Sequence, residues 1–185
     1  MQIIGLSGKK KCGKSYVATY IENMFPVCKR ISFADKLKTV VTELFSLEDE
    51  CYDPDKKEIV LEQWGVTPRT LMQKIGTEMF RNTLQEVIPD ISMPYNSIWV
   101  TNVHNQIISL NPKYVDCVII DDVRFPDEYD CIRNLGGKVI EIIRPFTPTD
   151  MDSHASEGGC PADFRLQNTT AEEISEQLRT YLKHT

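Results

Sequence analysis

The sequence predicts an α/β fold in which a mainly parallel, five-stranded sheet lies between two layers of helices. Three observations lead to this prediction: a glycine- and lysine-rich loop directly after the first apolar run, further short apolar runs, and helical patterns between most of them. Continuous apolar runs of four to eight residues are typical of strands buried on both faces. Helices between such strands make right-handed crossovers, so they cover both faces of the sheet. The 185 residues suit a single domain.

The first element is the strand Ile3–Leu6, and the loop after it matches the phosphate-binding pattern G-x-x-x-x-G-K-[ST] at residues 8–15. Glycines allow a tight turn whose N–H groups face one anion, the pattern's lysine reaches the outer phosphates, and its hydroxyl ligates Mg²⁺. A solvated lysine-rich turn is the alternative. The strand before the loop and the helical apolar spacing from Val17 to Phe25 favour the phosphate loop. We therefore expect a nucleoside triphosphate to bind, with Lys14 and Ser15 in these roles.

The remaining elements follow from apolar runs and from helical periodicity. Pro26 ends the first helix, and Thr170 with Glu173 forms a capping box before the last. The further strands are expected at Lys29–Phe33, Val115–Ile120, Lys138–Ile143 and Phe164–Gln167. The helices are expected at Lys14–Phe25, Asp35–Leu47, Pro68–Val87, Pro126–Leu135 and Ala171–Tyr181.

Two polar stretches interrupt this alternation. Residues 46–66 are rich in Asp, Glu and Lys, and we expect a lid-like surface insertion or flap there. Residues 145–162 are rich in Thr, Ser, Gly, Pro and Asp, and we expect a mobile loop that orders over a ligand.

Composition and charge exclude several functional classes. The net charge of −6 argues against broad attachment to nucleic acid or to an anionic membrane. The six cysteines are scattered without a C-x-x-C pair, which favours reduced core thiols, and the three histidines lack zinc-site spacing. No run approaches the roughly 20 apolar residues of a membrane span, and no secretory signal is visible. We expect a soluble, cytoplasmic protein; the sequence leaves its oligomeric state open, with a homodimer as the common default.

A second group of polar residues follows the strand that ends at Ile120. Asp121, Asp122 and Arg124 come at the carboxyl edge of the sheet, where open α/β sheets bind their ligands. A carboxylate there can hold Mg²⁺ or orient an acceptor phosphate, and an arginine can grip that phosphate. Assigning the metal-orienting role to Asp122 rests on its spacing to Arg124, and the choice between Asp121 and Asp122 stays open; the two side chains should point to opposite faces if the strand continues. A plain helix start explains Pro126 and Asp127 and is an alternative for Glu128.

The stretch from Thr67 to Arg81 is the third informative one. Arg69, Gln73 and Gly76–Thr77 fall three to four residues apart, so they share one helical face, while Leu71, Ile75 and Met79 form an apolar stripe on another. The stripe is core. The polar face is either solvated or part of a binding site.

Taken together, these stretches resemble the phage-type deoxynucleoside monophosphate kinase family, a branch of the P-loop nucleotide kinases. The resemblance covers most of the chain, although no family motif matches residues 46–66. It rests on Leu6-Ser7-Gly8, Ser32-Phe33-Ala34-Asp35-Lys36-Leu37-Lys38, Leu71-Met72-Gln73 with Gly76-Thr77, Asp122-Val123-Arg124-Phe125-Pro126 with Glu128, Ile143-Arg144-Pro145, His154 with Glu157, and Asn168.

The resemblance implies a P-loop kinase fold and transfer of the γ-phosphoryl group of ATP to a deoxynucleoside 5′-monophosphate, with Mg²⁺ required, in the supply of nucleotides for DNA synthesis. Lys14, Asp122 and Arg124 would be catalytic, and Ser15 would bind the metal. The implied ATP-binding residues are Gly8, Cys12, Gly13, Lys14, Ser15, Tyr16 and Arg144. The implied acceptor-binding residues are Lys10, Asp35, Lys38, Arg69, Gln73, Gly76, Thr77, Trp99, Asp122, Arg124 and Glu128.

Other interpretations remain open at this point. Trp99 is equally interpretable as a core aromatic. A phosphomevalonate-type kinase shares the phosphate loop and a D-x-R segment but uses a non-nucleotide acceptor. A P-loop ATPase or GTPase switch is a different class, against which the absence of an N-K-x-D motif argues. A nucleotide-binding module without catalysis is disfavoured by the intact Lys14, Ser15, Asp122 and Arg124. The acceptor's base is not readable from the sequence.

Overall fold

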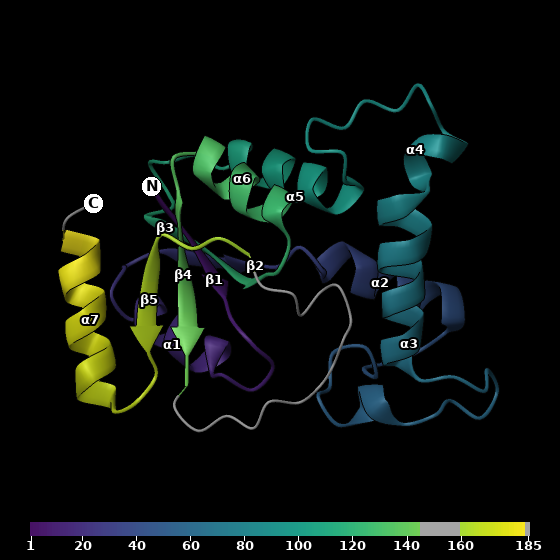
Figure 1. The fold of residues 1–185 in the computed structure, drawn as a ribbon, viewed down its shortest axis with the longest axis horizontal. Coiled ribbons are helices and arrows are strands. Elements are labelled where there is room, and N and C mark those ends of the chain that lie inside the picture. Colours follow the sequence, from purple (N-terminus) through teal and green to yellow (C-terminus); the bar gives the residue numbers. More distant parts are fainter. Residues whose placement is uncertain (145–159, 184–185) are drawn as a thin grey trace. The chain divides into compact units, whose positions relative to one another are not determined.

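The computed structural model describes residues 1–144 and 160–183 (Figure 1). The chain forms two compact units, which are described one at a time. The sheet unit consists of Met1–Ser32 and His104–Thr185, and the helical unit consists of Phe33–Val103. The sequence-based expectation of a single domain remains a prediction.

The sheet unit is built on a five-stranded sheet in the order β2-β3-β1-β4-β5. Every neighbouring pair is parallel, which confirms the predicted fold class. Strands β4 and β5 have the predicted bounds, whereas β2 and β3 are displaced from theirs. The strands are β1 (Gln2–Ser7), β2 (Cys28–Ile31), β3 (Cys117–Val123), β4 (Lys138–Ile143) and β5 (Phe164–Gln167).

Helices cover both faces of this sheet. On one face, α1 (Lys14–Glu22) and α7 (Ala171–Lys183) bury Val17, Ile174 and Leu178 against alternate residues of β1, β3, β4 and β5. On the other face, α6 (Pro126–Asn134) packs on β1 and β4. The packing at Gly5 is tight, because a Cβ added to Gly5 would lie 2.6 Å from Cδ1 of Ile132. The sheet is therefore the central layer of an α/β/α arrangement.

Strand β3 is the main departure from the predicted strand bounds. It begins two residues later than predicted and continues through Asp121 and Asp122 to Val123. Its pairing with β1 shifts register at that point, because Gly5 lies opposite Ile120 and Ser7 opposite Val123. The two acids thus belong to the strand itself, at a local irregularity near its carboxyl end.

The helical unit has its own small core. Val41, Leu47, Cys51 and Ile75 are buried there. Leu47 and Cys51 belong to the polar segment 46–66, so apolar side chains anchor that segment within the unit. The elements wholly within this unit are α2 (Asp35–Phe45), the 3-10 turn η1 (Lys56–Glu58), α3 (Pro68–Gln73), the π-helix η2 (Lys74–Asn82) and α4 (Leu84–Val87).

The predicted continuous α-helix over Pro68–Val87 is wrong in its middle. Residues 74–82 form a π-helix, and Thr83 separates it from α4. Two contacts of Gly76 accompany the wider turn. Its carbonyl accepts a hydrogen bond from outside the helix, from the Trp99 indole at 2.9 Å, and the Leu37 side chain occupies the space that a Cβ would need. Sequence periodicity contains no sign of either contact.

Helix α5 (Ile98–Ile108) has no counterpart among the predicted elements. Its sequence is rich in β-branched residues and Asn, which have low intrinsic helix propensity. Trp99, Val103 and Ile107, spaced four residues apart, are buried, as is Val100. Burial of this stripe stabilises the helix, as tertiary packing commonly does for a segment of low propensity.

The cysteines are mostly core residues, as predicted. Cys12, Cys51, Cys117 and Cys131 are buried. Burial raises the pKa of the Cys117 thiol well above its ordinary value, and the neighbouring Cys28 contributes to the rise. None of the helices that the structure describes is both long enough and apolar enough to cross a membrane.

Candidate active site

The loop between β1 and α1 has the curled backbone that the phosphate-binding pattern predicts. Gly13, which precedes α1, has φ 94°, and Gly8 has φ 134°, values that side-chain-bearing residues rarely adopt. Both positions are also tightly approached. A Cβ on Gly8 would lie 2.5 Å from the Ile142 carbonyl oxygen, and one on Gly13 would lie 2.1 Å from Nδ2 of Asn168. Larger residues at these two positions would displace the loop.

Lys14 lies within this loop. Its ammonium group donates to the carbonyl oxygen of Gly8 at 2.6 Å and to that of Lys9 at 3.0 Å, and it is 3.8 Å from Sγ of Cys12. The loop therefore carries a positive charge held by its own backbone. Loop amides and a lysine in this arrangement provide the two kinds of group that bind a polyphosphate.

Cys12 and Asn168 hold the loop on the sheet. The Cys12 side chain is buried in the core cluster that includes residues of α1, and its predicted part in ATP binding stays a prediction. The side chain of Asn168, buried just after β5, donates to the Cys12 carbonyl oxygen at 2.7 Å. Asn168 is absent from the predicted site residues. The sequence feature that could have identified Asn168 is its position as a polar residue at the carboxyl end of a buried strand.

The first turn of α1 presents two predicted ATP-site residues at the surface. Ser15 is exposed, and its hydroxyl has no hydrogen-bond partner among the residues that the structure describes. Tyr16 is also exposed, and its hydroxyl lies 3.2 Å from that of Tyr20. An unengaged hydroxyl directly after the loop lysine fits the metal-binding role predicted for Ser15.

The two acids at the end of β3 have different partners. Asp121 forms an ion pair with Arg30 of β2, at 2.6 Å from its Nη2. Asp122 accepts a hydrogen bond of 2.5 Å from the Ser32 hydroxyl just after β2. Because the register shifts here, strict alternation of side chains no longer applies. Both acids are thus engaged by residues of β2 or directly after it, and the predicted functional role of Asp122 stays a prediction.

Glu128 shapes the backbone that carries Arg124. Its carboxylate is 3% exposed and accepts hydrogen bonds from the backbone N–H groups of Arg124 at 2.7 Å and Phe125 at 3.1 Å. Glu128 thus holds the start of α6, which is the structural alternative stated for it. A direct contact between Glu128 and a ligand remains a prediction.

In the helical unit, α3 and η2 carry four of the predicted acceptor residues. Arg69 of α3 donates from Nε and Nη2 to the same oxygen, Oε1 of Glu58, at 2.7 and 2.6 Å. Gln73 and Thr77 are half-buried, and Gly76 is buried. Glu58 lies in the segment for which the sequence offered no motif, so this contact was not predicted.

Trp99 has the contacts of a core aromatic. It is buried, it donates its indole N–H to Gly76, and its ring lies 5.5 Å from that of Phe80. These contacts support the packing alternative. A nucleotide contact for Trp99 remains a prediction.

Two further predicted acceptor residues open α2. The Lys38 ammonium lies 3.8 Å from the Asp35 carboxylate and 5.6 Å from the centre of the Tyr52 ring. Asp35 is exposed and Lys38 is half-buried. The lysine is thus held by a weak ion pair and an aromatic face.

The predicted residues divide between the two units. The helical unit contains Asp35, Lys38, Arg69, Gln73, Gly76, Thr77 and Trp99. The sheet unit contains Gly8, Lys10, Cys12, Gly13, Lys14, Ser15, Tyr16, Asp122, Arg124, Glu128 and Arg144. Arg144 is exposed directly after β4, and Lys10 is half-buried in the phosphate loop. Most of the predicted loop 145–162, with His154 and Glu157, lies outside the described residues.

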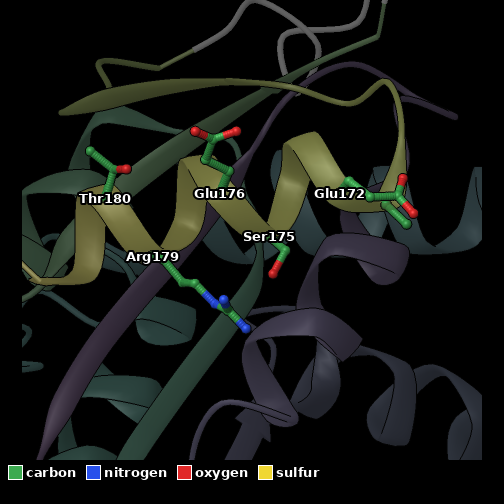
Figure 2. Close-up of a pocket in the computed structure, with 6 residues that line it drawn as sticks. Glu172, Ser175, Glu176, Arg179 and Thr180 are labelled. Atoms are coloured by element: carbon green, nitrogen blue, oxygen red, sulfur yellow. The ribbon is translucent and has the colours of Figure 1, made fainter.

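A surface depression on α7 does not include any of these residues. Its lining residues all belong to that helix, and Figure 2 shows Ser175 and Arg179 pointing to one side while Glu176 and Thr180 point to another.

Comparison with known proteins gives this geometry a family. Residues 49–174 match the family described as deoxynucleotide monophosphate kinase. A chain from Acanthamoeba polyphaga mimivirus, described as a putative deoxynucleotide monophosphate kinase, is 37% identical over 164 residues, which are 85% of this chain and 81% of the relative. This chain belongs to the deoxynucleotide monophosphate kinase family.

Two more distant matches agree with this membership. The deoxynucleotide monophosphate kinase of Enterobacteria phage T4 is 28% identical over 126 residues, covering 66% of this chain and 47% of the phage protein. The crystal structure of TT1252 from Thermus thermophilus is 16% identical and covers 99% of this chain and 97% of its own, with a TM-score of 0.52. The structural match concerns the fold alone. Family membership makes this chain a phosphotransferase and confirms the resemblance read from its motifs.

Proposed function

We propose that this member of the deoxynucleotide monophosphate kinase family transfers the γ-phosphoryl group of ATP to a deoxynucleoside 5′-monophosphate. One observation carries the proposal: the Lys14 ammonium is held within a curled glycine loop, in a chain that matches this family over residues 49–174. In the reaction, an oxygen of the acceptor phosphate bonds to the γ-phosphorus. The bond from that phosphorus to the β–γ bridging oxygen breaks, so ADP and a deoxynucleoside diphosphate leave.

The residues of the sheet unit would handle ATP. The amides of the phosphate loop and Lys14 would bind the phosphates, and Tyr16 and Arg144 would border the nucleotide. The exposed hydroxyl of Ser15, with Asp122, would hold Mg²⁺, which neutralises charge on the phosphate oxygens when it is bound. No covalent enzyme intermediate is needed, because positioning and charge stabilisation provide most of the catalysis in phosphoryl transfer.

Binding of the acceptor would use the residues predicted for it. Arg69 and Lys38 would bind its phosphate, since guanidinium and ammonium groups make strong, charge-assisted hydrogen bonds to phosphate. Gln73 and Thr77, half-buried on the helical face that includes Arg69, would contact the sugar and base. Arg124 and Lys10 would approach the transferred group.

The other candidate functions have less support. A phosphomevalonate-type kinase and a nucleotide-driven switch would both need the phosphate loop, but the family match favours a nucleotide acceptor over either. Soluble, cytoplasmic localisation and a homodimer are part of the proposal, and light scattering of the purified protein tests the second.

The deciding experiment measures ADP formation from ATP and Mg²⁺ with each deoxynucleoside monophosphate, each ribonucleoside monophosphate, phosphomevalonate, or water alone. We expect turnover with a subset of the deoxynucleotides, and this subset would identify the base. Turnover with phosphomevalonate alone, or with water alone, would refute the proposal. Omitting Mg²⁺ from the active mixture should abolish turnover.

A further inference from the structure

We infer that Glu58 is a positioning residue for the acceptor phosphate, acting through Arg69. The inference rests on the proposed function, in which Arg69 binds that phosphate. Glu58 lies in η1, within the segment 46–66 that matched no family motif in the sequence, and Arg69 lies in the first turn of α3. Both belong to the helical unit, where α3 and η1 pack together.

The geometry of the ion pair determines which edge of the guanidinium is used. Both Nε and Nη2 of Arg69 donate to Oε1 of Glu58, at 2.7 and 2.6 Å. These N–H groups lie along one side of the planar group, so Glu58 occupies the side edge. The Arg69 side chain makes no other hydrogen bond or ion pair within residues 1–144 and 160–183. Its end edge, formed by Nη1 and the outer N–H of Nη2, therefore retains a free pair of donors.

A free pair of parallel donors is the arrangement that binds phosphate in a bidentate manner. An arginine side chain has several freely rotating bonds, and ordering them on binding costs affinity. Because Glu58 already fixes the guanidinium plane, the acceptor would meet a fork that is ordered beforehand. Arg69 also shares a helical face with Gln73, so a phosphate on its fork would place the nucleoside along the predicted acceptor residues.

The alternative is that Glu58 occupies the phosphate's own position and must be displaced. The side-edge contact argues against this, because one carboxylate oxygen engages Arg69 and the end edge is left open. The two interpretations predict opposite changes in acceptor affinity. The pair is partly exposed, with side-chain exposures of 22% for Arg69 and 44% for Glu58, so the expected effect is a few-fold.

The test compares Glu58→Ala, Glu58→Gln and Arg69→Ala with the wild-type protein. Each variant is first checked for an unchanged thermal midpoint. We expect Glu58→Ala to raise the KM for the deoxynucleoside monophosphate about three- to fivefold, with kcat and the KM for ATP unchanged. Glu58→Gln should lie closer to wild type, because its amide oxygen can accept the same two N–H groups. In the Arg69→Ala background, Glu58→Ala should have no further effect.

Asp49→Asn is the matched control. Asp49 lies in the same segment and forms an ion pair of similar length, with the Lys56 ammonium at 2.6 Å, but its carboxylate is not paired with Arg69. We expect its acceptor KM to equal that of wild type. A lowered KM in Glu58→Ala, an unchanged KM, an equal rise in Asp49→Asn, or a rise that persists without Arg69 would each overturn the inference. A wild-type protein that phosphorylates no deoxynucleotide would instead refute the proposed function itself.

Discussion

The phosphate loop of the sheet unit and the α3–η2 segment of the helical unit differ in the origin of their contacts. Lys14 bonds to backbone groups only five and six residues away. In contrast, Gly76 is held by Trp99, twenty-three residues along the chain, and Arg69 by Glu58, eleven residues before it. Contacts of the first kind join residues that are close together in the chain, whereas contacts of the second kind depend on the surrounding fold. The comparison therefore separates a lysine that nearby backbone groups hold from a helical segment that distant side chains hold.

The largest expected effect is at the loop. Lys14→Ala should lower kcat by about a hundredfold or more, because it removes a charged donor from the transferred phosphates. The fold should survive, since Lys14 is only half-buried and its side-chain hydrogen bonds stay within the loop. The measurement is ADP formation beside a thermal melt, and Lys9→Ala, which removes an exposed lysine of the same loop, is the matched control. Undiminished turnover in a folded Lys14→Ala protein would contradict the assignment.

Asn168 tests whether the loop depends on anything outside its own motif. Asn168→Ala leaves the buried Cys12 carbonyl without its 2.7 Å donor, at a cost of about 1–3 kcal/mol in the free energy of unfolding. We expect the KM for ATP to rise and the KM for the acceptor to stay the same. Asn168→Asp keeps the size of the side chain but loses its N–H donor, so we expect the same changes as in Asn168→Ala. A loop as active as wild type in both variants would show that its local contacts suffice.

Trp99 tests the other side of the comparison. Trp99→Phe keeps an aromatic ring against Phe80 but leaves the buried Gly76 carbonyl without its donor, which costs about 1–3 kcal/mol in the free energy of unfolding. Because Gly76 lies between predicted acceptor residues, the KM for the acceptor should rise more than that for ATP. Trp64→Phe is the control. The Trp64 indole donates a hydrogen bond of 3.2 Å to the Phe45 carbonyl oxygen, and neither residue is a predicted acceptor residue. Equal effects of both variants on the two KM values would remove the special role given to Trp99.

The smallest effect concerns a region outside both sites. Burial, with a smaller contribution from the Asp163 charge, raises the pKa of Tyr181 to about 12 from its ordinary value of 10.0. The folded state thus retains the phenol proton more strongly, so the free energy of unfolding should fall as the pH rises from 10 toward 12. Tyr181→Phe should lose less stability over this range in urea denaturation, with turnover unchanged. Tyr114→Phe, at a tyrosine that is 73% exposed, is the control, and it should lose as much stability over this pH range as the wild-type protein.

The parts of the fold that sequence reasoning predicted are those with strong local signals. Strands β4 and β5 have the predicted bounds, and α1, α2, α6 and α7 begin at the predicted residues. Helix α5 was missed because its β-branched residues favour strands, and only burial of Trp99, Val100, Val103 and Ile107 makes it a helix. The π-helix was missed because its accompanying contacts, with Trp99 and Leu37, come from elsewhere in the chain.

The sequence by itself determined the sheet unit's fold class, the phosphate loop with Lys14, and the family, because each depends on periodicity or on residues close together in the chain. Tertiary structure alone decided that Asn168 anchors the loop, that Asp121 is engaged by Arg30, and that Trp99 and Glu58 hold the helix carrying the predicted acceptor residues. The physical reason is that a hydrogen bond or ion pair requires two groups to meet. When the groups are distant in the chain, only the folded backbone brings them within reach.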